Sequence, residues 1–268
     1  GYIDLNIYRT IKPRVLLLIK TQMGSRILQN YLPKTPMQIL NMLYEDIYEQ
    51  LSVLLLDPYA NYFCLKLFCF IGTNERLSYL RSILSNIVTF SVNKIATYPI
   101  QCIIGNLSTK KEKELLMEHI NGNIKKLTLD IYGTHVIEKI ISCFEVEYTK
   151  FIVEYAISSF MSLSIDPSGI CVIKKIIETH NEKSFYYNSI KRNVIENIHI
   201  LINHQFGNQV IQSVITSWND ISEIMLLIKN KMCSLSNGKY SSNVIEKCIE
   251  RSEEILSEYI KELSENDL

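Results

Sequence analysis

The sequence has little of what most enzymes, membrane proteins and strongly basic nucleic-acid-binding proteins require. Its 28 basic residues balance 28 acidic ones, so the chain carries no net charge at pH 7. The apolar run 15–19 is flanked by Arg14 and Lys20, and a membrane helix needs roughly 18 or more apolar residues. The chain has no glycine-rich phosphate loop and no nucleophile elbow. We therefore expect no enzyme, no membrane span and no signal peptide.

Cysteine and histidine are too scattered to predict a metal site. The seven cysteines include no CxxC pair, and none stands at zinc-binding spacing from a histidine. Most of them fall inside apolar helical stretches, which predicts buried free thiols in a reducing compartment. We expect His119, His180 and His199 to be surface or packing residues, and His204 to have a loop role. The sequence predicts no metal, no cofactor and no catalytic residue.

What the sequence does contain is a short pattern that returns seven times. Each copy has a small residue, two polar-leaning positions, two apolar positions and a polar one, often followed by lysine. The residue after the small one stands at 25, 61, 97, 134, 170, 208 and 242, so the spacings are 36, 36, 37, 36, 38 and 34 residues. A fixed period in this range is typical of a helical solenoid, in which each repeat packs on its neighbours.

Apolar residues recur at helical spacing both within and between these motifs. Val136 and Ile137 are followed by Ile140 and Ile141, which places all four on one face of a helix. A period of 36 residues accommodates two substantial helices and a short third one. We therefore expect an all-α, right-handed, curved superhelical solenoid of about seven (or eight) three-helix repeats. It would form a single domain over residues 1–268, with motifs centred near 27, 63, 99, 136, 172, 210 and 244.

The small residue at each motif start predicts close packing between neighbouring helices. Asp57, Asp130 and Asp166 precede three motifs and favour a helix start. Pro99 stands early enough in its helix to be tolerated in the first turn. Trp218 stands in an expected turn between helices, where it is either a packing residue or an exposed partner contact. The small residues are Gly24, Ala60, Ala96, Gly133, Gly169, Gly207 and Ser241.

The polar positions of the motif suggest a recognition surface. If the residue after the small one is position 1, positions 1 and 5 lie one helical turn apart, with position 2 beside them and positions 3 and 4 in the core. We expect positions 1 and 5 to form an exposed pair. Short polar residues with amides or carboxylates can bond to base edges, and Arg, Tyr or His can stack on base faces. The pairs read Ser/Gln, Asn/Leu, Thr/Gln, Thr/Glu, Ile/Lys, Asn/Gln and Ser/Glu, and position 2 reads Arg, Tyr, Tyr, His, Cys, Gln and Asn.

The chain resembles the Pumilio (PUF) family of RNA-binding proteins over essentially its whole length. The phrases that carry the resemblance match this family's first, second, sixth and seventh repeats in that order. They are Gly24-Ser25-Arg26-Ile27-Leu28-Gln29, Asp57-Pro58-Tyr59-Ala60-Asn61-Tyr62, Phe206-Gly207-Asn208-Gln209-Val210-Ile211-Gln212 and Tyr240-Ser241-Ser242-Asn243-Val244-Ile245-Glu246-Lys247-Cys248.

The resemblance implies that each repeat reads one base of a single-stranded RNA running antiparallel to the protein along the concave face. In that code the seventh repeat selects guanine, the sixth and second select uracil, and the first selects adenine. The implied RNA is a UGU-containing element that ends in UA. The implied RNA-binding residues are Ser25, Arg26, Gln29, Asn61, Tyr62, Thr97, Tyr98, Gln101, Thr134, His135, Glu138, Asn208, Gln209, Gln212, Ser242, Asn243 and Glu246.

Several repeats depart from the family pattern. Ile170 and Lys174, with Cys171 at position 2, cannot form the usual edge pair, so the fifth repeat is expected to accept any base or none. Leu65 replaces the usual glutamine and weakens the uracil preference of the second repeat. The third repeat is ambiguous between uracil and adenine, and the fourth favours guanine. Residues 263–268 look like the beginning of an eighth repeat.

The resemblance implies a monomeric, cytoplasmic regulator of translation and mRNA stability that binds 3′ untranslated regions. Repressor or deadenylase proteins would bind its convex face. One alternative is a nucleolar, relaxed-specificity member of the same superfamily that acts in ribosome biogenesis. Another is a protein-binding solenoid of armadillo or HEAT type that binds no RNA. For Tyr62 and Tyr98, half-buried packing competes with base stacking, and Lys66, Lys139, Lys175 and Lys247 either line a ridge near phosphates or are simply solvated.

Overall fold

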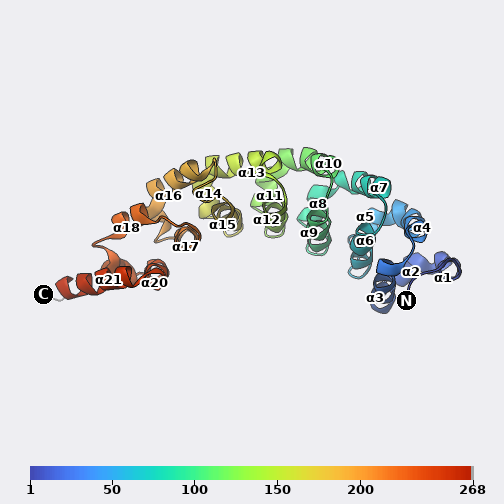
Figure 1. Ribbon diagram of the computed structural model, residues 1–268, viewed down its shortest axis with the longest axis horizontal. Coiled ribbons are helices and arrows are strands. Elements are labelled where there is room, and N and C mark those ends of the chain that lie inside the picture. Colours follow the sequence, from blue (N-terminus) through green and yellow to red (C-terminus); the bar gives the residue numbers. More distant parts are fainter. Residues whose placement is uncertain (267–268) are drawn as a thin grey trace. The chain divides into compact units, whose positions relative to one another are not determined.

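A computed structural model describes residues 1–266 of the chain, and every regular element among them is a helix (Figure 1). The chain forms two compact units, residues 1–148 and the residues from 149 onward. None of the helices in the described part is long and apolar enough to cross a membrane. The all-α prediction is confirmed. Residues 263–266, which were expected to begin an eighth repeat, instead continue the helix α21 (Glu253–Asn266), and residues 267–268 lie outside the described part of the chain.

Each sequence motif forms one helix, and we call these seven the motif helices. In the first unit α3 packs on α6, α6 on α9 and α9 on α12, and in the second α15 packs on α17 and α17 on α20. Within each unit, the repeat period therefore corresponds to motif helices that pack side by side in chain order. The motif helices are α3 (Gln22–Tyr31), α6 (Ala60–Phe68), α9 (Thr97–Gly105), α12 (Gly133–Cys143), α15 (Gly169–Thr179), α17 (Asn208–Ser217) and α20 (Ser241–Arg251).

Each motif helix is followed by a second helix, and we call these the backing helices. Figure 1 shows α4, α7 and α10 on the opposite side of the first unit from its motif helices, and α13, α16 and α18 placed likewise in the second. The backing helices are α4 (Met37–Ile47), α7 (Thr73–Leu84), α10 (Lys110–Ile120), α13 (Val146–Ser158), α16 (Tyr187–Leu201), α18 (Ser222–Ile228) and α21 (Glu253–Asn266).

Short helices complete the three-helix repeats that the sequence predicts. One such helix precedes each motif helix except α17, because α16 runs on to Leu201 without a break. The short helices are α2 (Val15–Ile19), α5 (Leu51–Leu54), α8 (Ile87–Ser91), α11 (Ile124–Thr128), α14 (Phe160–Ser164) and α19 (Met232–Ser236). The remaining elements are α1 (Leu5–Ile11) and the 3-10 turns η1 (Lys12–Arg14), η2 (Leu32–Lys34), η3 (Tyr48–Gln50) and η4 (Asn121–Asn123).

Positions 3 and 4 of the motif form the core, with one exception. Val136, Ile137, Val210 and Ile211 are fully buried, but Ile27 at position 3 of α3 is 48% exposed. Each residue turns the helix by about 100°, so position 3 points roughly away from position 1. Position 1 faces the following repeat, and position 3 therefore faces the preceding one. The expectation that Ile27 is buried is wrong, because α3 has no earlier motif helix beside it in the described chain.

The glycines at four of the motif starts are required by close backbone packing, as predicted for these small residues. A Cβ atom added to Gly133 would lie 2.7 Å from the carbonyl oxygen of Leu127, and one added to Gly169 would lie 2.9 Å from Cα of Leu163. These distances are shorter than carbon contacts allow, so a larger residue would push the motif helix away from the short helix before it.

The residues before the motifs cap the turns that lead into the motif helices. Oδ1 of Asp130 accepts hydrogen bonds from the backbone N–H groups of Tyr132 and Gly133, both at 2.8 Å. Asp57 and Asp166 make the same pair of bonds. His204 takes this place before α17, where its Nδ1 accepts from Phe206 at 3.1 Å and Gly207 at 3.2 Å. The predicted loop role of His204 is confirmed, because its side chain caps the turn that leads into α17.

Trp218 and the cysteines also have defined places. The Trp218 ring is 2% exposed, its Nε1–H donates to the carbonyl oxygen of Ile177 at 3.4 Å, and it packs edge-on against Tyr187. Trp218 is therefore a packing residue. All seven cysteines are free thiols, as predicted, but only Cys64 and Cys248 are buried and Cys143 is exposed. The expectation that most are buried is wrong, because several of these helical positions turn toward solvent.

A buried ion pair joins two backing helices of the first unit. The side chain of Glu112 on α10 is fully buried and accepts a 2.7 Å hydrogen bond from Nε of Arg76 on α7. Arg76 also donates to the carbonyl oxygen of Asn106 at 2.6 Å and lies over the ring of Phe68. One arginine thus connects neighbouring repeats through charge, backbone and aromatic contacts.

Candidate nucleic-acid interface

Position 1 of the motif is buried, contrary to the exposed pair predicted from the sequence. Its side chains are at most 7% exposed in the first six repeats, and only Ser242 in the seventh is half-buried. Position 1 faces the next repeat, so neighbouring helices cover it. Little of a position-1 side chain is therefore open to a base edge, and position 1 acts mainly by orienting its neighbours. The six residues are Ser25, Asn61, Thr97, Thr134, Ile170 and Asn208.

The hydroxyl groups at position 1 connect one repeat to the next. Oγ of Ser25 donates a 2.8 Å hydrogen bond to the backbone carbonyl of Tyr59, which precedes α6. Oγ1 of Thr97 donates to the carbonyl of Tyr132, which precedes α12, at 3.3 Å. Sequence reasoning missed these contacts, because the acceptor is a backbone oxygen that no side-chain pattern reveals.

The same position-1 groups orient the amides at position 5. The Ser25 hydroxyl donates its single hydrogen to Tyr59, so toward Gln29 it can only accept, and Gln29 Nε2 donates to it at 2.9 Å. Gln101 donates to Thr97 in the same way at 3.1 Å. Each amide thus uses one N–H inside the protein. The carbonyl oxygen and the second N–H remain for a partner outside, which is the donor and acceptor pair that a base edge requires.

The sixth repeat fixes its amide with asparagine instead of a hydroxyl. Nδ2 of Asn208 donates to the carbonyl oxygens of His204 at 2.8 Å and Gln205 at 2.9 Å, so its Oδ1 faces Gln212. Gln212 Nε2 donates to this oxygen at 2.7 Å. The orientation of Gln212 is therefore set by a chain of bonds that begins at the backbone.

The second repeat has the asparagine without the glutamine. Asn61 Nδ2 donates to the carbonyl oxygen of Asp57 at 2.7 Å, as in the sixth repeat. Its Oδ1 is buried and has no hydrogen-bond partner among the described residues. Leu65 stands at position 5 and offers no donor. The replacement of glutamine by Leu65 therefore leaves the buried Asn61 Oδ1 without a hydrogen-bond donor.

Position 2 supplies the exposed side chains of the motif helices. Tyr62 is 45% exposed and Tyr98 is 53% exposed, and their rings lie 5.9 Å apart in a tilted arrangement. Arg26 and His135 are exposed as well. These two tyrosines come from neighbouring repeats, so each presents one side of its ring to the other and part of it to solvent. Aromatic faces of this kind can stack on bases.

The first and second repeats enclose a cavity of about 490 Å³. Position 1, 2 and 5 residues of α3 line it together with Tyr62 of α6, so the structure brings the predicted adenine-binding set together. Arg26 offers a planar guanidinium, Tyr62 an aromatic face and Gln29 a fixed amide edge. The lining residues are Gln22, Ser25, Arg26, Gln29, Pro58, Tyr59 and Tyr62.

In the fourth and fifth repeats the position-5 side chain has a different kind of partner from the amides described above. Glu138 of the fourth repeat pairs with Nδ1 of His135 at 2.9 Å, so position 2 and position 5 contact each other on one helix. Lys174 of the fifth repeat donates to Oε1 of Gln209 at 3.4 Å, which joins it to position 2 of the sixth repeat. Ile170 is buried and apolar. The fifth repeat therefore has no oriented amide.

The seventh repeat exposes its polar set most. Asn243 and Glu246 are exposed, and Ser242 is half-buried beside them at the start of α20. A carboxylate in this place can accept two hydrogen bonds from neighbouring N–H donors on one base edge. The seventh repeat thus carries a free acceptor, whereas the first, third and sixth carry amides.

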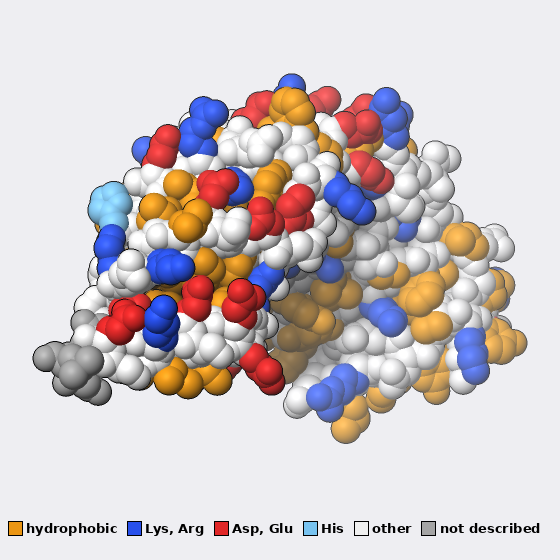
Figure 2. All heavy atoms as spheres, turned by 60° about the vertical axis from the view of Figure 1, so that its left-hand side comes forward, with side chains coloured by type: hydrophobic (Ala, Val, Ile, Leu, Met, Phe, Trp, Pro, Cys, Tyr) orange, Lys and Arg blue, Asp and Glu red, His pale blue; other side chains and the backbone are white. Residues whose placement is uncertain are grey.

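Charge around these helices is mixed. Figure 2 shows Lys and Arg side chains interspersed with Asp and Glu on the face in view, in keeping with the zero net charge. Two of the four motif lysines form ion pairs with acidic residues of their own helix, Lys175 with Glu178 at 3.0 Å and Lys247 with Glu250 at 2.6 Å. Recognition by these helices must rest more on hydrogen bonds and stacking than on charge.

Comparison with known proteins places this geometry in a family context. Residues 123–154, 159–182, 197–228 and 231–263 match the model of the Pumilio-family RNA binding repeat. A Pumilio domain-containing protein of Schizosaccharomyces pombe is 28% identical over 237 residues, which is 88% of this chain and 34% of that protein. Suppressor protein MPT5 of Saccharomyces cerevisiae is 27% identical over 257 residues, 91% of this chain and 30% of the relative. The chain thus spans about a third of the length of these curated relatives.

A solved structure shows the same architecture. The Puf3 RNA binding domain bound to a Cox17 RNA 3′ UTR recognition sequence superposes with a TM-score of 0.84 and 25% sequence identity. The match covers 97% of this chain and 77% of the Puf3 chain. The helical repeats seen here are therefore the repeats of that protein class.

Proposed function

Because the chain belongs to the Pumilio family of RNA-binding repeat proteins, we propose that its motif helices read single-stranded RNA through positions 2 and 5. The observation that carries this proposal is the set of internally fixed amides. Gln29, Gln101 and Gln212 each donate one side-chain N–H to the position-1 residue. The second N–H and the carbonyl oxygen of each amide remain available as donor and acceptor for a base. Such fixed edges discriminate between bases, because a mismatched base leaves polar groups unpaired.

The preferred RNA in this proposal contains UGU and ends in UA. Glu246 accepts hydrogen bonds from the two N–H donors on the guanine edge, and Gln212 pairs with uracil. At the other end, the cavity at Gln29 holds adenine between Arg26 and Tyr62. A protein with this preference would act in the cytoplasm on mRNA 3′ untranslated regions and regulate their translation or stability. Repressor or deadenylase partners would supply that effect.

Fluorescence anisotropy tests the preference directly. A labelled eight-nucleotide RNA that contains UGU and ends in UA is compared with the same RNA in which UGU is changed to ACA. We expect tight binding to the first and a loss of about tenfold or more with the second, since each mismatched contact costs on the order of 1 kcal/mol or more. The variant Glu246→Ala should bind with relaxed selection at guanine only. Equal binding of both RNAs by the wild-type protein would contradict the UGU preference.

The middle repeats favour a second candidate, a relaxed-specificity RNA-binding factor of ribosome biogenesis. Ile170 is buried and apolar, and Lys174 is bonded to Gln209, so the fifth repeat has no fixed base-reading edge. This candidate predicts similar affinity for the UGU and ACA RNAs and nucleolar localisation of the tagged protein. The absence of binding to either RNA would instead favour a protein-binding solenoid.

A further inference from the structure

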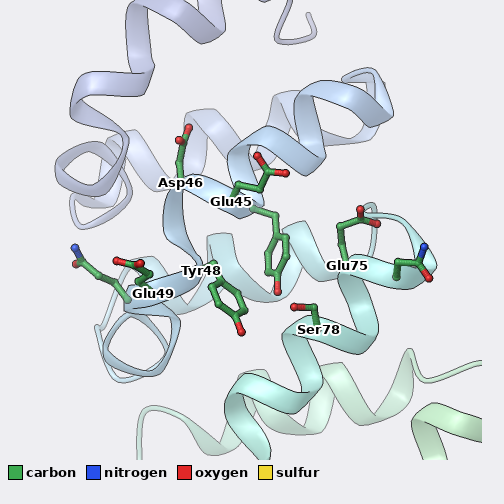
Figure 3. Close-up of a pocket in the computed structure, with 9 residues that line it drawn as sticks. Glu45, Asp46, Tyr48, Glu49, Glu75 and Ser78 are labelled. Carbon is green, nitrogen blue, oxygen red and sulfur yellow. The ribbon is translucent and has the colours of Figure 1, made fainter.

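The first unit has an acidic cavity on its backing-helix side. It has a volume of about 530 Å³ and lies between α4, η3 and α7. Figure 3 shows Glu45 and Asp46 from α4 and Glu49 from η3. It also shows Glu75 and Ser78, which come from α7 in the next repeat. The motif helices occupy the other side of this unit (Figure 1), so the cavity is no part of the proposed RNA site.

Most of the carboxylates around this cavity lack a cationic partner. Asp46 accepts a 2.7 Å hydrogen bond from the Tyr8 hydroxyl and pairs with Lys12 at 3.4 Å, so its charge is compensated. Glu45, Glu49 and Glu75 have no ion pair with any residue in the described chain. Arg76 follows Glu75 in the sequence, but its guanidinium is bound to the buried carboxylate of Glu112. The cavity therefore carries a concentrated negative charge.

A buried tyrosine provides an independent sign of a ligand. Tyr44 lines the cavity, is 4% exposed and packs against Tyr79 of α7 with ring centroids 6.1 Å apart. Its hydroxyl oxygen is buried beside Ser78, which lines the same cavity, but makes no hydrogen bond of normal geometry with any residue that the structure describes. Burial raises the pKa of Tyr44 to about 12, so the phenol stays neutral. Unsatisfied buried hydroxyls are rare, because they lose their bonds to water without replacement.

An exposed aromatic ring completes the cavity. Tyr48 is 40% exposed and meets Tyr44 edge-on, with ring centroids 5.5 Å apart. The cavity therefore combines three uncompensated carboxylates, a ring face open to solvent and one unsatisfied hydroxyl. This combination repels phosphate groups and attracts a planar cation.

We propose that this cavity binds an arginine side chain in a basic segment of a partner protein. A guanidinium is always charged, offers five N–H donors in one plane and stacks on aromatic rings. It can pair with Glu45 and Glu75, donate to the Tyr44 hydroxyl and lie against Tyr48. Lysine presents three donors on a compact head group and cannot stack in the same way. Because the cavity and the motif helices lie on opposite sides of the unit, the protein can bind RNA and the basic segment at the same time.

Peptide binding to the whole chain tests this assignment. The probe is a fluorescein-labelled peptide with two arginines in a glycine and serine background, and the matched probe carries citrulline, which keeps the shape and removes the charge. We expect the arginine peptide to bind at least tenfold more tightly than the citrulline peptide, and more tightly than a lysine peptide. Saturating RNA should leave this affinity unchanged.

Variants locate the site. The double variant Glu45→Gln/Glu75→Gln should lose about tenfold in affinity for the arginine peptide, while Glu114→Gln/Glu118→Gln on α10 makes the same charge change outside the cavity and should bind normally. Tyr44→Phe should weaken peptide binding without lowering thermal stability, because it removes only an unsatisfied hydroxyl. The proposal is overturned if the wild type binds both peptides equally. It is also overturned if the cavity double variant binds normally, or if the control double variant loses as much affinity.

Discussion

Gln212 donates a 2.7 Å hydrogen bond to Oδ1 of Asn208, and this bond is missing at the corresponding place in the second repeat. There Asn61 keeps the same bond to the backbone four residues earlier, but its Oδ1 is buried without a partner. The two repeats thus provide an internal comparison. They share the position-1 residue and differ at position 5, so the consequences of the amide pair can be measured within one protein.

Leu65→Gln should restore the missing pair. The new amide can donate to Oδ1 of Asn61, which we expect to raise the free energy of unfolding by about 1 kcal/mol. It should also sharpen uracil selection by the second repeat, because a fixed amide edge becomes available. Urea unfolding and anisotropy with RNAs varied at that base measure the two effects. The control Leu65→Met fills similar volume without a donor, and a gain of the same size there would show that packing is responsible.

His204→Ala should destabilise the turn before α17. Nδ1 of His204 accepts from two backbone N–H groups, and alanine leaves both without a partner, which costs about 1 kcal/mol. His204→Asp should keep the stability, because aspartate makes the same two bonds before α12 and α15. Thermal unfolding of the three proteins checks this order. Equal melting temperatures for the alanine and aspartate variants would show that the cap contributes nothing.

The Arg76–Glu112 pair should make stability depend on pH in the acid range. Burial by itself raises the pKa of Glu112, but hydrogen bonds from Arg76 and from the backbone of Thr109 and Ser108 outweigh it and hold the pKa below its ordinary value of 4.5. A carboxylate with a lowered folded-state pKa stabilises the protein fully above 4.5 and loses that contribution as pH falls through the folded-state value.

The comparison of wild type with Glu112→Gln isolates this contribution. We expect the variant to be less stable by about 1–3 kcal/mol at pH 7, and the difference to shrink as pH falls below 4.5. Urea unfolding at pH values from 7 to 3 gives both curves. Glu114→Gln on the exposed side of α10 should change stability by less than about 0.5 kcal/mol at every pH. A difference at Glu112 that stays constant with pH would contradict the assignment.

Salt should weaken RNA binding only modestly. Lys66 and Lys139 have no ion pair with a described residue, whereas Lys175 and Lys247 are paired with glutamates. If the two unpaired lysines contact phosphates, the logarithm of affinity should fall with that of salt at a slope of about −1.4, and at about −3 if all four do. Anisotropy at several salt concentrations gives the slope. A value much steeper than −3 would show that charge dominates binding.

The sequence predicted the helical repeats well, because period, small residues and apolar spacing are local properties that stacking preserves. It failed at position 1, where the pattern does not reveal how closely the next repeat approaches. Ser25 and Thr97 therefore proved to be buried bridges and not exposed contacts. The acidic cavity could not be predicted from the sequence either, because Tyr44 and Glu75 are brought together only by the packing of one repeat on the next.

The bond from Ser25 to the backbone of Tyr59 has a consequence for anyone who wishes to reprogram this chain. In the proposed mode of recognition the Gln29 amide reads the base and the Ser25 hydroxyl orients that amide, yet the same hydroxyl also holds adjacent repeats in register. A substitution chosen only for the base would remove a link between two layers of the stack. The Ser25 side chain serves both base recognition and the contact between the first two repeats, so the two cannot be altered independently.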